Sequence, residues 1–160
     1  MLYPLSYEGS LGSLATAPPC PACALTYALP MATGHEPRVL IVEDEAVILR
    51  LLEVNFRLAG FEVETATRGE EALAKASARP PDVAILDIML PGLSGLEVCE
   101  RLRAMPATAE VPVIVLSART QDEDRERSYA LGVVAYVTKP FEPAELVEVV
   151  RRALDPSAGA

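Results

Sequence analysis

The sequence predicts an α/β fold: a doubly wound, five-stranded parallel sheet with five helices on both of its faces, although the same pattern also fits a different α/β strand order. Two observations predict it. From Arg38 onward, strand-like and helix-like segments alternate five times. Most of the strand-like segments are continuous apolar runs, which are typical of parallel strands that are buried on both faces.

Four of the predicted strands are apolar throughout, and one alternates. The continuous runs are residues 39–42, 83–86, 113–116 and 133–137. Residues 61–64 instead alternate Phe or Val with Glu. This alternation is expected of an edge strand with one face in water.

The first predicted helix carries apolar residues at helical spacing. One face of this helix carries Val47, Leu51, Val54 and Leu58. We interpret this apolar face as the one that packs against the sheet. Gly60 follows and is placed to cap the C-terminal end of this helix.

The later helices are predicted from the residues at their ends. Three segments have the spacing of a capping box, which opens a helix: Thr67…Glu70, Ser94…Glu97 and Thr120…Glu123. Prolines at residues 80, 81 and 106 end the second and third helices, and Pro143 begins the last one, residues 143–154. The fourth helix is almost wholly polar over residues 121–128, so we expect it to bury little. Such a helix is either a movable element or an ordinary helix with a solvated face.

Polar side chains directly follow the apolar strands. Glu43 and Asp44 follow the first strand, Asp87 the third, Ser117 the fourth and Lys139 the fifth. In open α/β sheets the carboxyl ends of the strands line the ligand crevice where the winding reverses. With the first and third strands adjacent, three carboxylates are expected to converge there.

Three neighbouring carboxylates repel one another, and a divalent cation relieves the repulsion. Mg²⁺ prefers oxygen ligands and often binds one or two carboxylates together with a phosphate. Lys139 would add a positive charge and Ser117 a hydroxyl donor. Because aspartate is a known covalent acceptor of phosphoryl groups, these residues predict a site for a dianion beside Mg²⁺, built on Asp87.

Four motifs stand on the predicted strand ends. They are Val39-Leu40-Ile41-Val42-Glu43-Asp44-Glu45, Leu86-Asp87-Ile88-Met89-Leu90-Pro91-Gly92-Leu93-Ser94-Gly95, Leu116-Ser117-Ala118-Arg119 and Tyr136-Val137-Thr138-Lys139-Pro140-Phe141. In this order they resemble the receiver domains of two-component response regulators, including stand-alone ones. The resemblance covers residues 38–154 and implies a flavodoxin-like sheet with the strand order 2-1-3-4-5.

The resemblance implies a phosphorelay role and a metal site. Asp87 would be the phosphoacceptor, taking the group from a phosphohistidine on a sensor histidine kinase or a phosphotransfer protein. Glu43, Asp44 and Asp87, with the backbone carbonyl of Met89, would hold Mg²⁺. The protein would be a signalling phosphoacceptor that assists its own phosphoryl transfer and slow autodephosphorylation, and not an enzyme.

The resemblance also implies how the signal is passed on. Lys139 would pair with the acyl phosphate, beside a cis Lys139–Pro140 bond. Ser117 would hydrogen-bond a phosphoryl oxygen, and Tyr136 would move inward behind it as a switch. The face formed by the fourth helix, fifth strand and fifth helix would then contact a downstream protein.

The same face departs from many receivers that are attached to DNA-binding domains. Those relatives carry an acidic pair before the tyrosine, where this chain has residues 133–135 as Val-Val-Ala. Val149 stands where they usually have a basic residue. These changes put a charged dimer interface in doubt, so we expect a monomer or a weak dimer.

Composition indicates which partners and which compartment to expect. The net charge is −9, which repels phosphate backbones, so we expect no direct contact with nucleic acid. No apolar stretch approaches the roughly 18 residues of a membrane span, so no membrane insertion is expected. Three cysteines do not form a disulfide framework, which indicates a cytoplasmic protein.

Residues 1–37 differ from the rest of the chain. They contain no Lys or Arg, are rich in Pro, Ala, Ser and Gly, and are expected to be a disordered extension. Because Met31 closely precedes the first strand, we hypothesise that it is the true start and that residues 1–30 are a start-site artefact. We expect residues 155–160 to be a short tail, too short for a further domain.

Two other functions remain open at this point. One is a phosphohydrolase that uses Asp87 as nucleophile, but this class usually needs a second acid two residues on, where Met89 stands. The other is a pseudo-receiver that binds partners without phosphorylation. A pseudo-receiver would not need Glu43, Asp44, Asp87 and Lys139, so the presence of all four residues counts against this function.

Overall fold

The computed structural model describes residues 35–118 and 121–155. The predicted start at Met31 lies outside these ranges, as do all but residues 35–37 of the predicted extension (1–37) and all but residue 155 of the predicted tail (155–160). Within them, no helix combines the length and the apolar character that crossing a membrane requires.

The described chain contains one parallel sheet, in the predicted order. Its five strands are arranged β2-β1-β3-β4-β5, and each neighbouring pair is parallel. The strands are β1 (Arg38–Val42), β2 (Glu62–Ala66), β3 (Val83–Asp87), β4 (Val113–Ser117) and β5 (Ala135–Thr138).

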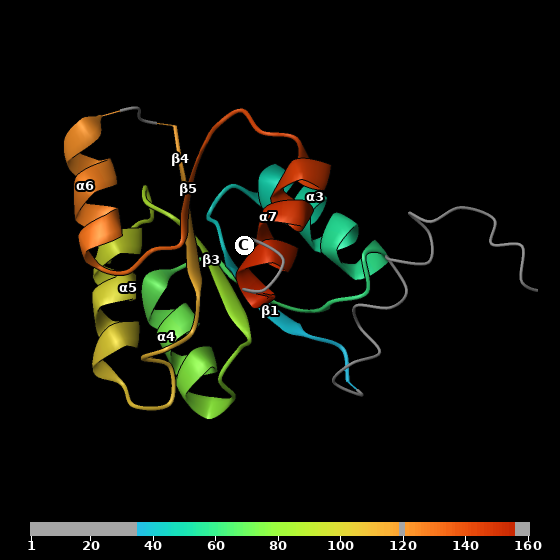
Figure 1. Cartoon of the computed structure of the whole chain (residues 1–160), viewed down its shortest axis with the longest axis horizontal. Coiled ribbons are helices and arrows are strands. Elements are labelled where there is room, and N and C mark those ends of the chain that lie inside the picture. The colour runs from blue at the N-terminus through green and yellow to red at the C-terminus, as the bar shows by residue number, and fades with distance from the viewer. Residues whose placement is uncertain (1–34, 119–120, 156–160) are drawn as a thin grey trace, which may run out of the picture. The chain divides into compact units, whose positions relative to one another are not determined.

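Helices cover both faces of this sheet, as predicted. They are α3 (Ala46–Leu58), α4 (Gly69–Ala78), α5 (Gly95–Ala104), α6 (Asp122–Ala130) and α7 (Pro143–Leu154). Figure 1 shows α3 and α7 on one face, and α4, α5 and α6 on the other. Winding in both directions from β1 places the carboxyl ends of β1 and β3 side by side.

Burial of the strands follows the apolar pattern of the sequence. Every residue of β1, β3 and β4 is buried, whereas most of β2 is half-buried, so the prediction of β2 as an edge strand is confirmed. The last strand begins at Ala135, two residues later than the apolar run. Val133 is buried ahead of it, and Val134 is half-exposed.

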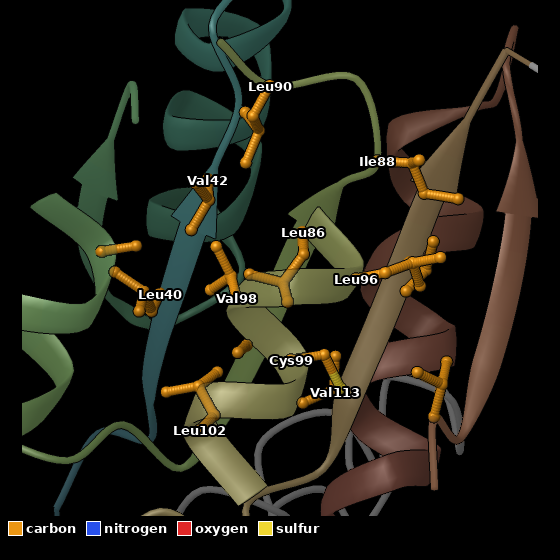
Figure 2. Packing of buried hydrophobic residues seen from close by; sticks show 14 of the residues in the cluster. Leu40, Val42, Leu86, Ile88, Leu90, Leu96, Val98, Cys99, Leu102 and Val113 are labelled. Carbon is orange, nitrogen blue, oxygen red and sulfur yellow. The ribbon is translucent and has the colours of Figure 1, made fainter. Parts of the chain in front are cut away.

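Each face of the sheet has its own apolar core. One lies under α3 and α7 and contains Leu52, Phe56 and Leu146. The other lies under α4 and α5, where Figure 2 shows Leu86 of the sheet and Cys99 of α5 within one cluster. These two cores hold the strands, and therefore their polar carboxyl ends, in fixed positions.

The predicted inward face of the first helix is wrong. Its four residues are the exposed ones: Val47 (77%), Leu51 (46%), Val54 (41%) and Leu58 (83%). Leu52 and Phe56 are fully buried instead, and the Phe56 ring packs edge-on against Phe61 at 5.3 Å. The helix has apolar residues on two sides, and the side that carries the large aromatic ring faces the sheet.

The predicted helix ends are mostly confirmed. Gly60 and Gly132 follow α3 and α6 with φ of 93° and 79°, a conformation that glycine adopts without strain. Pro143 begins α7. The capping box at Ser94 is present, with reciprocal hydrogen bonds between Ser94 and Glu97.

The capping box predicted at Thr67…Glu70 is wrong. The helix begins one residue later, with Arg68 as N-cap, and the Thr67 N–H and hydroxyl donate to Glu71 instead. For the box predicted at Thr120…Glu123, Thr120 lies outside the described residues. The helix that follows, α6, buries only Ser128, as its polar sequence predicts.

Candidate functional site

Three carboxylates meet at the carboxyl end of the sheet. Glu43 directly follows β1 and is fully buried, and Asp87 is the last residue of β3 and is 3% exposed. Oxygen atoms of Glu43, Asp44 and Asp87 lie within 4.8 Å of one another. These distances confirm the predicted convergence. Its cause is that β1 and β3 are neighbours in the sheet.

The ammonium group of Lys139 lies beside these carboxylates. Its Nζ is 2.7 Å from an oxygen of Glu43 and 3.3 Å from an oxygen of Asp87. The backbone N–H of Lys139 donates to the carbonyl of Ser117 at 2.8 Å, which fixes the chain just after β5. The Lys139–Pro140 bond is cis, as the resemblance implied.

Burial and charge shift the pKa values of this pair. Burial raises the pKa of the Glu43 carboxyl to about 7, and the charge of Asp87 adds to the rise, although a hydrogen bond from Lys139 opposes it. Burial lowers the pKa of Lys139, but the hydrogen bond to Glu43 and the charge of Asp87 outweigh this and raise it. Lys139 therefore stays charged at neutral pH, and it neutralises only part of the acidic cluster.

The loop after β3 holds the Asp87 side chain. One carboxylate oxygen of Asp87 accepts a hydrogen bond from the Met89 N–H at 3.2 Å. The Ile88 N–H donates to the carbonyl of Leu116, and the Gly95 N–H donates to the carbonyl of Ile88, both at 3.0 Å. These bonds tie the loop to β4 on one side and to the first turn of α5 on the other.

The cluster opens into a cleft of about 530 Å³. Its lining combines the predicted residues with two that the sequence reasoning missed, Glu45 and Ala118: Glu43, Asp44, Glu45, Asp87, Met89, Ala118 and Lys139. Their positions directly after Asp44 and Ser117 were the available signal. With oxygen donors and a surplus of negative charge, the residues present fit a hard divalent cation.

The two predicted switch residues lie on neighbouring strands. Ser117 is the last residue of β4 and is fully buried, but it does not line the cleft. Tyr136 lies on β5 opposite Val115 and is 9% exposed. The guanidinium of Arg125 in α6 lies 5.5 Å from the centre of the Tyr136 ring, which links α6 to this strand.

Comparison with known proteins settles the family. The family model described as "Response regulator receiver domain" matches residues 39–151. The chain belongs to the response regulator receiver domain family. The match begins at the second residue of β1 and ends within α7, so every strand and helix of the described fold lies wholly or mostly inside it.

Similar proteins include transcriptional regulators. The chain is 46% identical over 118 residues to the phosphate regulon transcriptional regulatory protein PhoB of Rhizobium meliloti, covering 74% of this chain and 52% of PhoB. It is 48% identical over 125 residues to the transcriptional regulatory protein PrrA of Mycobacterium tuberculosis, covering 78% of this chain and 53% of PrrA. The chain thus spans about half the length of these relatives.

Solved receiver structures share the fold. The chemotaxis protein CheY4 of Vibrio cholerae has a TM-score of 0.71 and 33% identity, covering 74% of this chain and 98% of CheY4. A response regulator from Chloroflexus aurantiacus has a TM-score of 0.70 and 38% identity, with the same coverage. The five parallel strands in the order 2-1-3-4-5, with five helices, are therefore the CheY-like arrangement.

Proposed function

We propose that this receiver domain accepts a phosphoryl group on Asp87 from a phosphohistidine of a sensor histidine kinase or phosphotransfer protein. A carboxylate oxygen of Asp87 attacks the phosphorus, a P–O bond forms and the P–N bond to the imidazole breaks. The leaving imidazole takes up a proton. The observation that carries the proposal is the convergence of three carboxylates and one ammonium group in an open cleft.

Within this proposal, Mg²⁺ is the cofactor that neutralises the incoming phosphoryl group. Glu43, Asp44 and Asp87 would hold it, together with the backbone carbonyl of Met89 in the lining of the same cleft. The oxygen donors and the partly compensated charge support this choice. Phosphoryl transfer needs positioning and charge neutralisation more than covalent chemistry, and this cluster supplies both.

Lys139 would bind the phosphoryl group after the transfer. Its ammonium group now contacts Glu43 and Asp87 at once, so a phosphoryl group on Asp87 would offer it a more highly charged partner. Ser117, at the end of β4, would donate its hydroxyl to a phosphoryl oxygen. Tyr136 would follow as the switch residue, supported by its place on β5 beside β4.

The signal would leave through the face formed by α6, β5 and α7. Helix α6 buries a single residue, so moving this helix would break few buried contacts. Arg125 connects it to Tyr136, and Val134 and Tyr129 are half-exposed on this side. A protein partner, or a weakly associated second copy, fits such a surface.

We propose that the receiver itself contacts protein and not nucleic acid. Its chain has a net charge of −9. Relatives such as PhoB and PrrA are named transcriptional regulators, and their matched portions are about half of each protein. The downstream partner would therefore be a DNA-binding protein or domain, and the receiver would act as a signalling phosphoacceptor and not as an enzyme.

The test is incubation of the full chain with acetyl phosphate and Mg²⁺, followed by intact-mass analysis. The expected result is a gain of one phosphoryl group, absent in Asp87→Asn and in EDTA. Asp82→Asn, an exposed acid at the opposite end of β3, is the matched control and should react like the wild type. Continuous release of phosphate from many phosphomonoesters would favour a hydrolase, and absence of any adduct, also with purified kinases, would favour a pseudo-receiver.

A further inference from the structure

Gly95, the first residue of α5, lies directly against the backbone of Asp87. A Cβ atom at Gly95 would lie 2.2 Å from the carbonyl oxygen of Asp87, 2.8 Å from its carbonyl carbon and 3.0 Å from the Cα of Ile88. Positive φ is not the reason for glycine, since among the described glycines only Gly60, Gly92 and Gly132 have it. The reason is space: α5 starts so close to Asp87 that no side chain fits between them.

Both sides of this contact are fixed. On the sheet side, Asp87 ends a strand in which every residue is buried, and the next N–H, that of Ile88, is bonded to the carbonyl of Leu116. On the helix side, the Gly95 N–H is bonded to the carbonyl of Ile88, and the capping box of Ser94 and Glu97 fixes the first turn. A methyl group at Gly95 must therefore move one of two well-held backbones.

The size of this movement follows from the distances. Relaxing a contact of 2.2 Å to the ordinary limit of 3.4 Å displaces the helix start and the acceptor backbone by about 1 Å. Asp87 and Met89, the residues on either side of Ile88, both line the cleft. A displacement of about 1 Å at a reacting group can reduce a rate by roughly 100-fold.

We propose that Gly95 is a positioning residue for phosphoryl transfer: the missing side chain lets the first turn of α5 set the place of the Asp87 carboxylate. This inference rests on the proposed function. It adds a residue that touches neither metal nor phosphoryl group and acts only through the backbone of Asp87.

Gly60 offers a control for the loss of stability. It follows α3 with a φ of 93°, a conformation that a residue with a side chain adopts only with strain, and a Cβ there would meet nothing within 4 Å. Gly60 lies before β2, at the end of the parallel sheet opposite Asp87. Gly60→Ala should therefore destabilise the fold, as Gly95→Ala does, without moving the acceptor.

The experiment compares wild type, Gly95→Ala and Gly60→Ala in the full chain. Urea unfolding gives the stability of each, Mn²⁺ titration gives the affinity for a divalent cation, and the rate of phosphorylation is measured against acetyl phosphate concentration. Both variants should lose stability. Only Gly95→Ala should lose maximal rate, by about 10- to 100-fold, and Mn²⁺ affinity, by about 10-fold.

Equal maximal rates and equal Mn²⁺ affinities in the two variants would overturn the role of Gly95. If Gly95→Ala is unfolded in buffer, all three proteins are compared in trimethylamine N-oxide, which favours the folded state. If the wild type itself takes up no phosphoryl group, the proposed function fails. The Mn²⁺ affinities then decide the positioning role alone.

Discussion

Replacement of Leu52 by alanine is expected to destabilise the domain much more than the same replacement at Leu58 in the same helix. Leu52 is fully buried between α3 and the sheet, whereas Leu58 is 83% exposed. Truncating a buried leucine typically costs about 2–5 kcal/mol, since the cavity that remains closes only in part. An exposed leucine should cost less than about 0.5 kcal/mol.

Urea denaturation followed by far-ultraviolet circular dichroism measures both losses. Because both variants change Leu to Ala inside α3, the change in helix propensity is the same and the difference isolates burial. A loss of about 3 kcal/mol at Leu52 corresponds to a fall in Tm of roughly 10 °C for a domain of this size. Equal losses, or a larger loss at Leu58, would mean that the other side of α3 faces the sheet.

Three further changes test the loops before β4 and β5, an ion pair of α4, and the proposed metal site. Arg103 donates to four backbone carbonyls in the loops before β4 and β5. Arg103→Ala should therefore lower the free energy of unfolding, measured in urea, by about 2 kcal/mol. The control Arg101→Ala, at an exposed position of the same helix, should lower it by less than about 0.5 kcal/mol. A hydrogen bond from Lys75 lowers the pKa of Glu71 below 4.5, so this stabilisation is present above pH 4.5 and is lost as the pH falls through the folded-state pKa. Glu71→Gln should therefore be slightly less stable than the wild type at pH 7 and no less stable in strong acid, as thermal melts across pH would show. Mg²⁺ at 100 times its dissociation constant should stabilise the wild type by about 2.7 kcal/mol relative to EDTA, and Asp44→Asn by clearly less, in paired urea titrations.

The place of the acidic cluster could be predicted because it depends on topology alone. Apolar runs locate the strands, and parallel strands bring their carboxyl ends to one edge. Glu43 and Asp87 were therefore predicted to meet although 44 residues separate them. The contact of Lys139 with Glu43, in addition to Asp87, could not be predicted, since it depends on the direction of a flexible side chain.

The inward face of α3 was predicted wrongly for a physical reason. Its sequence places apolar residues on two sides of the helix, and spacing alone does not choose between them. The choice is made by tertiary packing, in which the Phe56 ring meets Phe61 of the following segment. As a consequence, four apolar residues of α3 stay exposed on its other side: Val47, Leu51, Val54 and Leu58.

Gly95 and Arg103 show a second limit of sequence reasoning. A glycine at the start of a helix has the pattern of an ordinary helix-end residue, and an arginine near the other end of a helix has the pattern of a solvated charge. Their roles arise only when separate segments dock: Gly95 against the backbone of Asp87, and Arg103 across the loops before β4 and β5. No local pattern carries that information.

The account depends most on Asp87 as the acceptor beside a divalent cation. The direct measurement is borohydride reduction after incubation with acetyl phosphate, which converts an acyl phosphate to an alcohol, followed by peptide mapping. The account predicts a reduced residue at position 87 when Mg²⁺ is present and none in EDTA. Reduction at another carboxylate, or at Asp87 to the same extent without a divalent cation, would contradict it.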